Sequence, residues 1–546
     1  MPKRNVLFIM CDQLRFDYLG CAGHPFLKTP NIDALAARGV RFTRAYAQSP
    51  VCGPSRMSYY TGRYVRSHGA TWNGFPLRIG EPTLGDHLRK IGVRTALVGK
   101  THMHADIEGM QRLGVDPRSS VGVLAAECGF EPYDRDDGLH PAGRLKPGAP
   151  YNAFLRSKGY GGANPWEEWA NSGEADDGTL QNGWLLVHSD KKARAAEEHT
   201  ETPWATGRAI EFIQEAEKDG EPWCLHLSYI KPHWPYIAPA PYHAMYDASQ
   251  VIPAVRSERE RGQDAHPVYR AFMDLRVSRA FSRDEVRDRV VPTYMGLIKQ
   301  IDDQLGRLFA FLRSEGLDQT TMIVFTSDHG DYLGDHWLGD KDLFHEASVK
   351  APMIVVDPSP QADSTRGQTC EALVEAIDLA PTFIEYFGGE SPRHILEGRS
   401  LAPWLHGESP PQWRANVFSE YDYSMQDVRD RLGVPVDECR LVMVFDGRWK
   451  YIHAPGFRPM LFDLQADPEE FEDRGGDPTC ESQRDRMRDA LLTWALADHS
   501  RITMSDAQIK GFSSRKQFET GLLIGYWDEA EVAQARGDAS PGDTDR

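Results

Sequence analysis

The chain has 546 residues, of which 40% are hydrophobic and 26% are charged, and this composition is ordinary for a globular protein and excludes a disordered chain. Its net charge of −18 argues against nucleic acid or an anionic membrane as a partner, so an anionic substrate would need a local cationic pocket. No stretch reaches the roughly 18 consecutive apolar residues that span a membrane.

The N-terminal segment has a short apolar run over residues 5–11 that ends at Asp12. It lacks the small-residue cleavage site of a signal peptide, so we interpret it as a buried strand and expect a cytoplasmic protein. The eight cysteines include no CxxC pair and are too sparse for a disulfide scaffold. Most of them are expected to be small buried hydrophobic side chains.

Further elements are predicted in chain order. A helix is expected to start at Pro30 with Thr29 as its N-cap, and another lies between Pro82 and Gly92. Apolar residues spaced by three and four predict a helix that follows Pro292 and stops at Gly316. Buried strands are predicted over residues 94–99, 223–230 and 321–326.

Strands that alternate with helices predict an α/β fold with a large, mostly parallel sheet sandwiched by helices. Residues 105–200 and 240–290 are rich in Gly, Pro, charge and Trp, and we interpret them as excursions that shape a pocket rather than core. A smaller C-terminal α+β domain with a short antiparallel sheet is predicted from strands at 441–445, 449–453 and 460–464. The expected organisation is a large α/β domain over 1–390, an α+β subdomain over 391–527 and an acidic polar tail over 528–546.

Polar residues directly follow four of the predicted strands: Asp12, Lys100, His233 and Asp328. The carboxyl edge of the sheet is where α/β proteins build their sites. We therefore expect these four side chains to face one site.

Residues 52–56, Cys-Gly-Pro-Ser-Arg, have the Cys-x-Pro-x-Arg form by which type I sulfatases mark a cysteine for oxidation to formylglycine. Alone, the motif also fits a buried cysteine in a Pro-containing turn with a surface arginine. Other motifs support the first interpretation, because they occur in the order expected for sulfatases: Asp12-Gln13, Thr61-Gly62-Arg63, Gly99-Lys100-Thr101-His102, Lys231-Pro232-His233, Asp328-His329-Gly330, Gly339-Asp340-Lys341, Ala351-Pro352 and Gly447-Arg448-Trp449-Lys450-Tyr451. The chain resembles the formylglycine-dependent sulfatases of the alkaline phosphatase superfamily, and also the neighbouring phosphonate monoester hydrolases.

This resemblance implies one divalent metal ion, with Asp12, Gln13, Asp328 and His329 as its ligands. A hard cation prefers oxygen ligands. Many sulfatases carry a second Asp at the Gln13 position and Asn at the His329 position. The set present here fits Mn²⁺ at least as well as Ca²⁺, and it does not exclude Zn²⁺. Asp12 taken alone also fits a capping or turn aspartate.

The resemblance also implies the roles of the remaining site residues. A formylglycine-generating enzyme would convert Cys52, and the hydrated aldehyde would attack the transferred group of a small anionic ester to form a covalent sulfo-enzyme. The implied roles are Arg56 to hold the diol, Lys100 and Lys341 to bind the sulfuryl oxygens, His102 as the base of the elimination, and His233 or Lys341 as the acid for the leaving oxygen.

Simpler interpretations exist for three of the candidates. Lys341 could be a solvated surface lysine, and His233 could be a turn histidine between two prolines. Asn73 could contact a substrate oxygen, although an ordinary turn asparagine is the better-supported interpretation.

Three classes of function compete: a sulfatase acting on aryl sulfates, a phosphonate monoester or phosphodiester hydrolase with the same nucleophile, and a non-catalytic binding protein. The third is weak because every chemical position is filled, and a two-metal phosphatase would need a Ser or Thr nucleophile. Gln13 and His329 favour the phosphonate enzymes, which tend to carry Tyr and Thr at positions 100 and 102. Lys100 and His102 favour the sulfatases, so aryl sulfates are predicted as the best substrates.

Apolar residues near the end of the chain, within 505–527, need a partner surface. They predict a homodimer, with a tetramer as the second choice. The alternative is that this segment docks on its own core.

Overall fold

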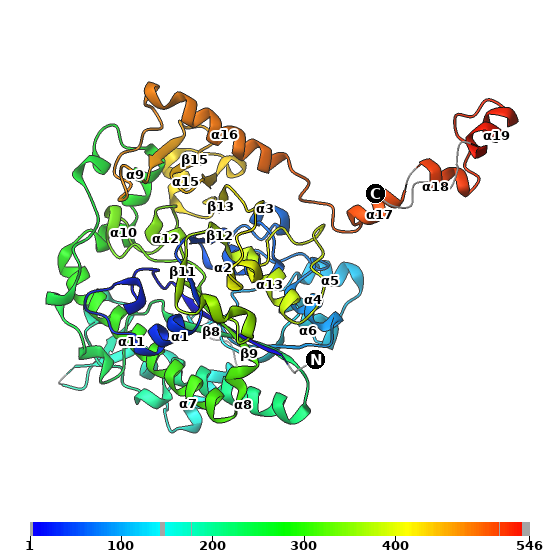
Figure 1. Cartoon of the computed structure of the whole chain (residues 1–546). Helices are drawn as coiled ribbons and strands as arrows, with labels where there is room; N and C mark the ends of the chain where they lie inside the picture. Colours follow the sequence, from blue (N-terminus) through cyan, green and yellow to red (C-terminus); the bar gives the residue numbers. More distant parts are fainter. Residues whose placement is uncertain (1–3, 142, 144–147, 176, 513, 538–546) are drawn as a thin grey trace. The chain divides into compact units, whose positions relative to one another are not determined.

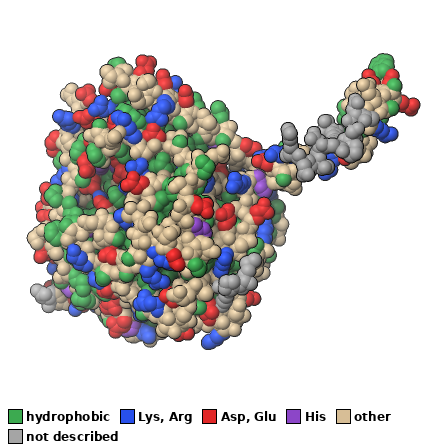
Figure 2. Space-filling model, in the orientation of Figure 1, with side chains coloured by type: hydrophobic (Ala, Val, Ile, Leu, Met, Phe, Trp, Pro, Cys, Tyr) green, Lys and Arg blue, Asp and Glu red, His purple; other side chains and the backbone are tan. Residues whose placement is uncertain are grey.

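The structure is a computed structural model that describes residues 4–141, 143, 148–175, 177–512 and 514–537 (Figure 1). The chain divides into two compact units, one of Met1–Ser391 with Leu396–Ala497 and one of Pro392–Ile395 with Asp498–Arg546. On the face of the larger unit seen in Figure 2, acidic and basic side chains are interspersed. The negative net charge is therefore not gathered into one patch on that face.

An eight-stranded sheet runs through the larger unit in the order β11-β2-β10-β9-β1-β8-β4-β5. Its strands are β1 (Asn5–Asp12), β2 (Val40–Phe42), β4 (Arg94–Gly99), β5 (Glu131–Arg135), β8 (Trp223–Pro232), β9 (Thr321–Ser327), β10 (Met353–Val356) and β11 (Gln368–Cys370). Strand β10 pairs antiparallel with both neighbours, and the other pairings are parallel. The predicted strands of the large, mostly parallel sheet are confirmed.

Helices cover both faces of this sheet, as predicted (Figure 1). Side chains alternate along β1, so Leu7 and Ile9 pack on one face and Val6 and Phe8 on the other. The first face is covered by α1 (Pro30–Arg38), α8 (Glu201–Asp219) and α11 (Asp284–Ser314). The second is covered by α2 (Cys52–Thr61), α4 (Leu84–Lys90) and α13 (Leu379–Tyr386).

One helix start differs from the prediction, and one predicted start is confirmed but capped differently. Helix α11 begins at Asp284 and contains Pro292 in its interior, because Val290 and its apolar neighbours are fully buried and their packing offsets the hydrogen bond that proline removes. Helix α1 has Thr29 at its N-cap, but the Thr29 side chain makes no capping bond. Asp302 of α11 accepts the free N–H groups of that first turn instead.

The segments 105–200 and 240–290 contribute to the core, contrary to the expectation for them. Trp166 and Tyr151 are fully buried in the cluster under α8 and α11, and Phe272 is buried in a second cluster. Weak periodicity hid this role, because these segments fold as short helices and turns. They are α5 (Ile107–Leu113), α6 (Ser120–Ala126), α7 (Pro150–Ser157), α9 (Pro267–Met273), α10 (Arg276–Phe281) and the hairpin of β6 (Ser172–Glu174) with β7 (Leu180–Asn182).

A four-stranded antiparallel sheet follows in the larger unit, in the order β13-β14-β15-β16. Three of its strands were predicted, and the fourth, β13, adds an edge. The bounds are β13 (Val417–Asp422), β14 (Arg440–Phe445), β15 (Trp449–His453) and β16 (Met460–Asp463). Helix α16 (Glu481–Leu496) packs on one face through Met487, Leu491 and Trp494.

The remaining elements are short. They are the parallel pair β3 (Ala45–Tyr46) with β12 (Val374–Glu375), and α3 (Val65–His68), α12 (Glu346–Val349), α14 (Ala402–Leu405) and α15 (Asp427–Leu432). The smaller unit contains α17 (Asp506–Gly511), α18 (Ser514–Glu519) and α19 (Glu529–Gly537), and residues 538–546 of the predicted tail lie outside the described residues. Within the described part of the chain, no helix combines the length and apolarity needed to cross a bilayer.

Candidate active site

The four polar residues predicted to face one site meet at one edge of the sheet. Asp12 ends β1, and Lys100, His233 and Asp328 directly follow β4, β8 and β9. These strands are neighbours and all parallel, so their carboxyl ends lie together. All four side chains are buried, each at most 2% exposed.

Cys52 is the first residue of α2, and Arg56 lies one turn later. Residues four apart share a helix face, so the spacing of the motif places the thiol and the guanidinium on the same side. Both side chains are fully buried. The alternative of a Pro-containing turn with a surface arginine is therefore wrong.

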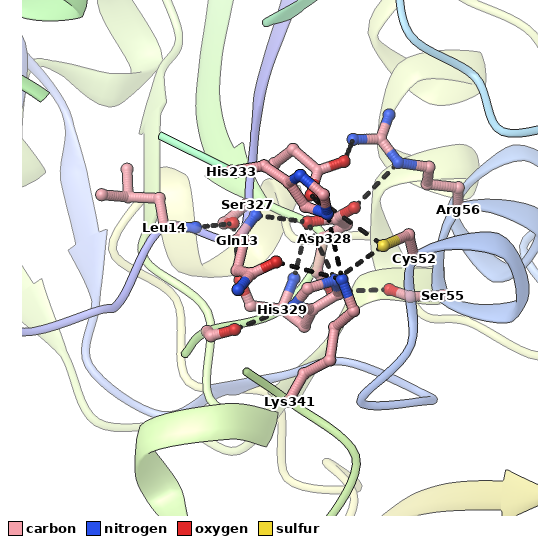
Figure 3. A network of polar contacts seen from close by, with 12 residues as sticks. Gln13, Leu14, Cys52, Ser55, Arg56, His233, Ser327, Asp328, His329 and Lys341 are labelled. Atoms are coloured by element: carbon pink, nitrogen blue, oxygen red, sulfur yellow. Dashed lines mark hydrogen bonds and ion pairs between the residues drawn. The ribbon is translucent and has the colours of Figure 1, made fainter. Parts of the chain in front are cut away.

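Arg56 holds the two carboxylates of the site. It donates to Asp328 Oδ2 at 2.8 Å and to Asp12 Oδ2 at 3.1 Å, and to the Lys100 carbonyl and Ser228 Oγ, both at 2.8 Å (Figure 3). These charge-assisted bonds fix both acids and offset part of their charge.

Asp12 uses its two oxygens differently. Oδ2 lies 2.5 Å from Lys100 Nζ as well as 3.1 Å from Arg56, whereas Oδ1 faces Cys52 Sγ and His233 Nε2, each at 3.9 Å. Burial and Cys52 raise the pKa of Asp12, but Lys100, His233 and Arg56 outweigh them and hold it below its usual value. Asp12 is thus a carboxylate with one oxygen turned toward Cys52.

The Cys52 sulfur lies 3.1 Å from His329 Nε2. Burial raises the pKa of the thiol, but the charges of Lys341, His329 and Lys100 lower it well below its usual value. The position therefore favours a negatively charged atom, and the N-terminus of α2 favours the same charge.

Asp12, Cys52, Asp328 and His329 can hold a metal ion, since their ligand atoms lie within 4.8 Å of one another and all four residues are buried. His329 Nδ1 lies 2.8 Å from the Gly330 carbonyl and donates to it, so Nε2 is the nitrogen that a metal would bind, in place of its proton. Burial lowers the pKa of His329, but Asp328 and Cys52 raise it to about 9. This local field attracts positive charge, so the residues fit a single divalent cation.

Gln13, which the sequence predicts as a further metal ligand, contacts this group through its backbone. Its backbone has a φ of 64°, and its N–H donates to Asp328 Oδ1 at 3.0 Å. Its Oε1 accepts a hydrogen bond from Lys341 Nζ at 3.0 Å. Its Nε2 donates to Asp331 and Asp340, which the sequence did not single out as functional.

Lys341 enters the site between two aspartates, Asp340 and Asp342, whose backbones are left-handed with φ of 64° and 105°. Its Nζ lies 3.2 Å from His233 Nε2, and its side chain is only 8% exposed. The alternative of a solvated surface lysine is therefore wrong. His233 Nδ1 donates to the Trp234 carbonyl at 2.7 Å, so His233 Nε2 is the acceptor from Lys341.

Protonation follows the same arrangement. Burial lowers the pKa of His233, which favours its neutral form. Burial also lowers the pKa of Lys341, but Asp340, Cys52 and Asp12 raise it well above its usual value. The proton of this pair therefore resides on Lys341, and His233 Nε2 accepts its hydrogen bond.

The loop that follows β4 is shaped by two features. A Cβ at Gly99, where φ is 98°, would lie 1.9 Å from the Ser228 carbonyl, so only glycine lets β4 run into Lys100. His102 has a φ of 56°, and its N–H and that of Thr101 both donate to Asp137 Oδ1, at 3.0 and 2.8 Å. The His102 side chain is among the neighbours that lower the pKa of Cys52.

Asn73 contacts the residue that follows Cys52. Its Oδ1 accepts the N–H of Gly53, the residue after Cys52, at 2.7 Å. This contact orders the start of α2 from the loop that carries Asn73. The residues that sequence reasoning missed, Asp331 and Asp137, act on site residues across long sequence separations, and no local pattern marks them.

The comparisons with known proteins agree with this geometry. The model of the sulfatase family matches residues 4–116 and 153–389, and the model of the N-sulphoglucosamine sulphohydrolase C-terminal region matches residues 334–496. PehA of Trinickia caryophylli, a multifunctional alkaline phosphatase superfamily protein, is 34% identical over 540 residues, which cover 94% of this chain and 100% of that protein. An arylsulfatase of Clostridium perfringens is 25% identical over 518 residues, covering 93% and 98%. The solved phosphonate monoester hydrolase from Silicibacter pomeroyi has a TM-score of 0.78 and 28% identity, covering 92% of this chain and 96% of its own.

Proposed function

Because this chain belongs to the sulfatase family of the alkaline phosphatase superfamily, we propose that it hydrolyses sulfate esters, aryl sulfates above all, with a formylglycine made from Cys52 as its nucleophile. Family membership makes it a hydrolase of sulfate or phosphonate esters, and the sulfate preference and the nucleophile are the proposal. The observation that carries it is the contact of Cys52 with the buried group of metal-ligating side chains, with Lys100 and His102 beside it.

In the modified protein, the two hydroxyl oxygens of the hydrated aldehyde would take the place of the Cys52 sulfur. One hydroxyl oxygen forms a bond to sulfur while the bond from sulfur to the ester oxygen breaks, which gives a covalent sulfo-enzyme. The departing alkoxide takes a proton from Lys341, which His233 orients at 3.2 Å. Removal of a proton from the second hydroxyl then re-forms the aldehyde and expels sulfate, and water rehydrates the aldehyde.

His102 is proposed as the base for that elimination, since it lies within reach of the Cys52 side chain. Lys100 and Lys341 bind the sulfuryl oxygens, and Arg56 holds the diol. A divalent ion, Mn²⁺ or Ca²⁺ with Zn²⁺ as a further option, would be held by Asp12, Gln13, Asp328 and His329 and would act as a Lewis acid that acidifies the attacking hydroxyl.

Hydrolysis of phosphonate monoesters is the second candidate, and two observations favour it. The structural likeness to a phosphonate monoester hydrolase extends over 92% of the chain. Gln13 and His329 also occupy the positions where that group of enzymes differs from many sulfatases. We propose that Lys100 and His102 face the transferred group and act on the step in which sulfate and phosphonate hydrolysis differ. In the choice of substrate we therefore give them more weight than the metal ligands.

The test compares kcat/KM for one aryl leaving group attached to sulfate, phenylphosphonate and a phosphodiester, for the wild type and for Lys100→Tyr/His102→Thr. We expect sulfate to be the best substrate of the wild type, and we expect the double substitution to reduce its turnover more than that of the phosphonate. A wild-type preference for phosphonate or diester of more than tenfold, about 1.4 kcal/mol in the transition state, would reject the sulfate assignment.

A further inference from the structure

The amide of Gln13 is held at both ends by charged side chains. Nε2 donates to Asp331 Oδ2 at 2.6 Å and to Asp340 Oδ1 at 2.9 Å, and Oε1 accepts from Lys341 Nζ at 3.0 Å. Figure 3 shows the amide oxygen turned toward Lys341. The side chain therefore bridges two acids and a cation, and Asp340 Oδ1 itself lies 3.5 Å from Lys341 Nζ.

Only one orientation of this amide satisfies its neighbours. A carboxylate only accepts and an ammonium only donates hydrogen bonds. If the amide of Gln13 turned over, its oxygen would face the carboxylates of Asp331 and Asp340, and its NH₂ would face Lys341. Three charge-assisted hydrogen bonds would become three repulsive contacts.

The two acids are themselves fixed before any ligand binds. Asp331 is fully buried, and its Oδ2 accepts from Tyr236 Oη at 2.9 Å while its Oδ1 accepts from the Leu333 N–H at 2.9 Å. Asp340 accepts the Tyr332 N–H through its carbonyl at 2.7 Å. Both carboxylates thus come from a braced loop between β9 and α12.

The backbone of Gln13 is braced as well. Its φ of 64° lies in the left-handed region, which is unfavourable for a residue other than glycine. Its N–H donates to Asp328 Oδ1 at 3.0 Å, and its carbonyl accepts from Tyr294 Oη at 2.7 Å. With the backbone fixed, the side-chain torsions are the freedom that remains, and the hydrogen bonds to the two acids restrict them.

We propose that Asp331 and Asp340 are positioning residues that lock the Gln13 amide with its oxygen toward the metal ligands and Lys341. A divalent cation takes amide oxygen and rejects amide NH₂ as a ligand. The two acids also account for an amide at position 13, since a carboxylate there would meet two others with no hydrogen between them. The inference rests on the metal site of the proposed function and not on the choice between sulfate and phosphonate.

A double-mutant cycle tests this, with Mn²⁺ alone as the probe and isothermal titration of the metal-stripped full chain as the readout. The variants are Asp331→Asn, Gln13→Leu and the double substitution. An asparagine at 331 offers one acceptor oxygen where Gln13 and Leu333 need two. We expect Asp331→Asn to weaken Mn²⁺ binding about tenfold or more, as loss of an outer partner of a metal ligand does. The double variant should bind no more weakly than Gln13→Leu, because Asp331 acts through Gln13.

The matched control is Asp342→Asn, which removes a buried acid next to Lys341 that contacts Gln426 and not Gln13. A loss in this control equal to that of Asp331→Asn, or additive losses in the double variant, would show a general charge effect and overturn the proposal. If Asp331→Asn folds poorly, Asp340→Asn provides a second variant, because the Asp340 side chain is partly exposed. It must show the same coupling to Gln13→Leu. Absence of Mn²⁺ binding by the wild type would overturn the metal site itself and this inference with it.

Discussion

Replacement of Arg56 by methionine tests how far the site depends on one buried cation. The side chain has no exposure and donates to both Asp12 and Asp328. Arg56→Met keeps much of the volume but leaves two buried acids without this partner. Breaking a buried pair from one side costs roughly 3–5 kcal/mol.

The change in melting temperature follows from the size of the chain. An unfolding entropy of about 2.1 cal/mol/K per residue gives ~1.1 kcal/mol/K for 546 residues unfolding together. A loss of roughly 3–5 kcal/mol then lowers Tm by about 3–5 °C. Added Mn²⁺ should reverse part of this loss, because a divalent cation offsets the charge of the same two acids.

Differential scanning calorimetry with and without Mn²⁺ measures both effects. Arg287→Met is the matched control, since Arg287 is buried and donates to the carbonyls of Leu333 and Ile252 rather than to site carboxylates. It should lower Tm, and Mn²⁺ should raise its Tm by no more than it raises that of the wild type. A Tm for Arg56→Met equal to that of the wild type, or a loss that Mn²⁺ leaves unchanged, would refute the role given to Arg56.

Four further predictions concern single features. Cys52→Ala should abolish nearly all turnover while circular dichroism and Tm stay close to wild type, and mass spectrometry should find formylglycine at position 52 in active protein; full activity of unmodified cysteine protein would contradict the nucleophile. Asp328→Ala should lose bound metal and activity together, as measured by elemental analysis and aryl sulfate turnover, and two metal ions per active site would contradict the single-ion arrangement. Burial raises the pKa of Glu420 to about 7 from 4.5, so the folded state binds the extra proton and stability falls as the pH rises from 4.5 to 7; Glu420→Gln should flatten this part of the stability curve in urea titrations. Ile524 and Trp527, each 87% exposed, should lie in a homodimer contact, so light scattering should find a dimer, with a tetramer as the second choice, and Ile524→Asp/Trp527→Asp should yield monomer; a wild-type monomer at micromolar concentration would contradict this.

The sequence predicts the strands of the large sheet, and the edge at which their carboxyl ends meet, because both follow from local patterns. The continuous apolar runs of β1, β8 and β9 have few alternatives in a chain of this composition, and a polar residue directly after each run marks one edge. The sequence cannot order the strands, since the neighbours of β1 come from positions more than 200 residues away.

The missed features share a physical cause. Asp302 caps α1 from α11, and Asp331 orients Gln13 from the loop after β9. Each of these bonds exists only when distant segments pack together, so no spacing in the chain encodes it. Pro292 was misinterpreted for a related reason: a local rule against proline inside a helix is overruled by the burial of the turns on either side.

The metal ligands favour phosphonate as the substrate, and the Lys100–His102 pair favours sulfate. One carboxylate, that of Asp12, belongs to the first group and contacts Lys100 of the second. Asp12 directs Oδ1 to the nucleophile and the metal ligands, and it directs Oδ2 to Lys100 at 2.5 Å. Lys100 lowers the pKa of Asp12 and keeps it ionised, and in the proposed mechanism it would also bind the transferred group. With an uncharged residue at position 100, Arg56 would still contact Asp12 Oδ2. The Asp12 carboxylate would therefore stay in place while the binding of the transferred group changed. In the proposed mechanism the metal ligands would act on the nucleophile, which both chemistries share, whereas Lys100 and His102 would act on the transferred group, and for this reason the proposal gives these two residues more weight.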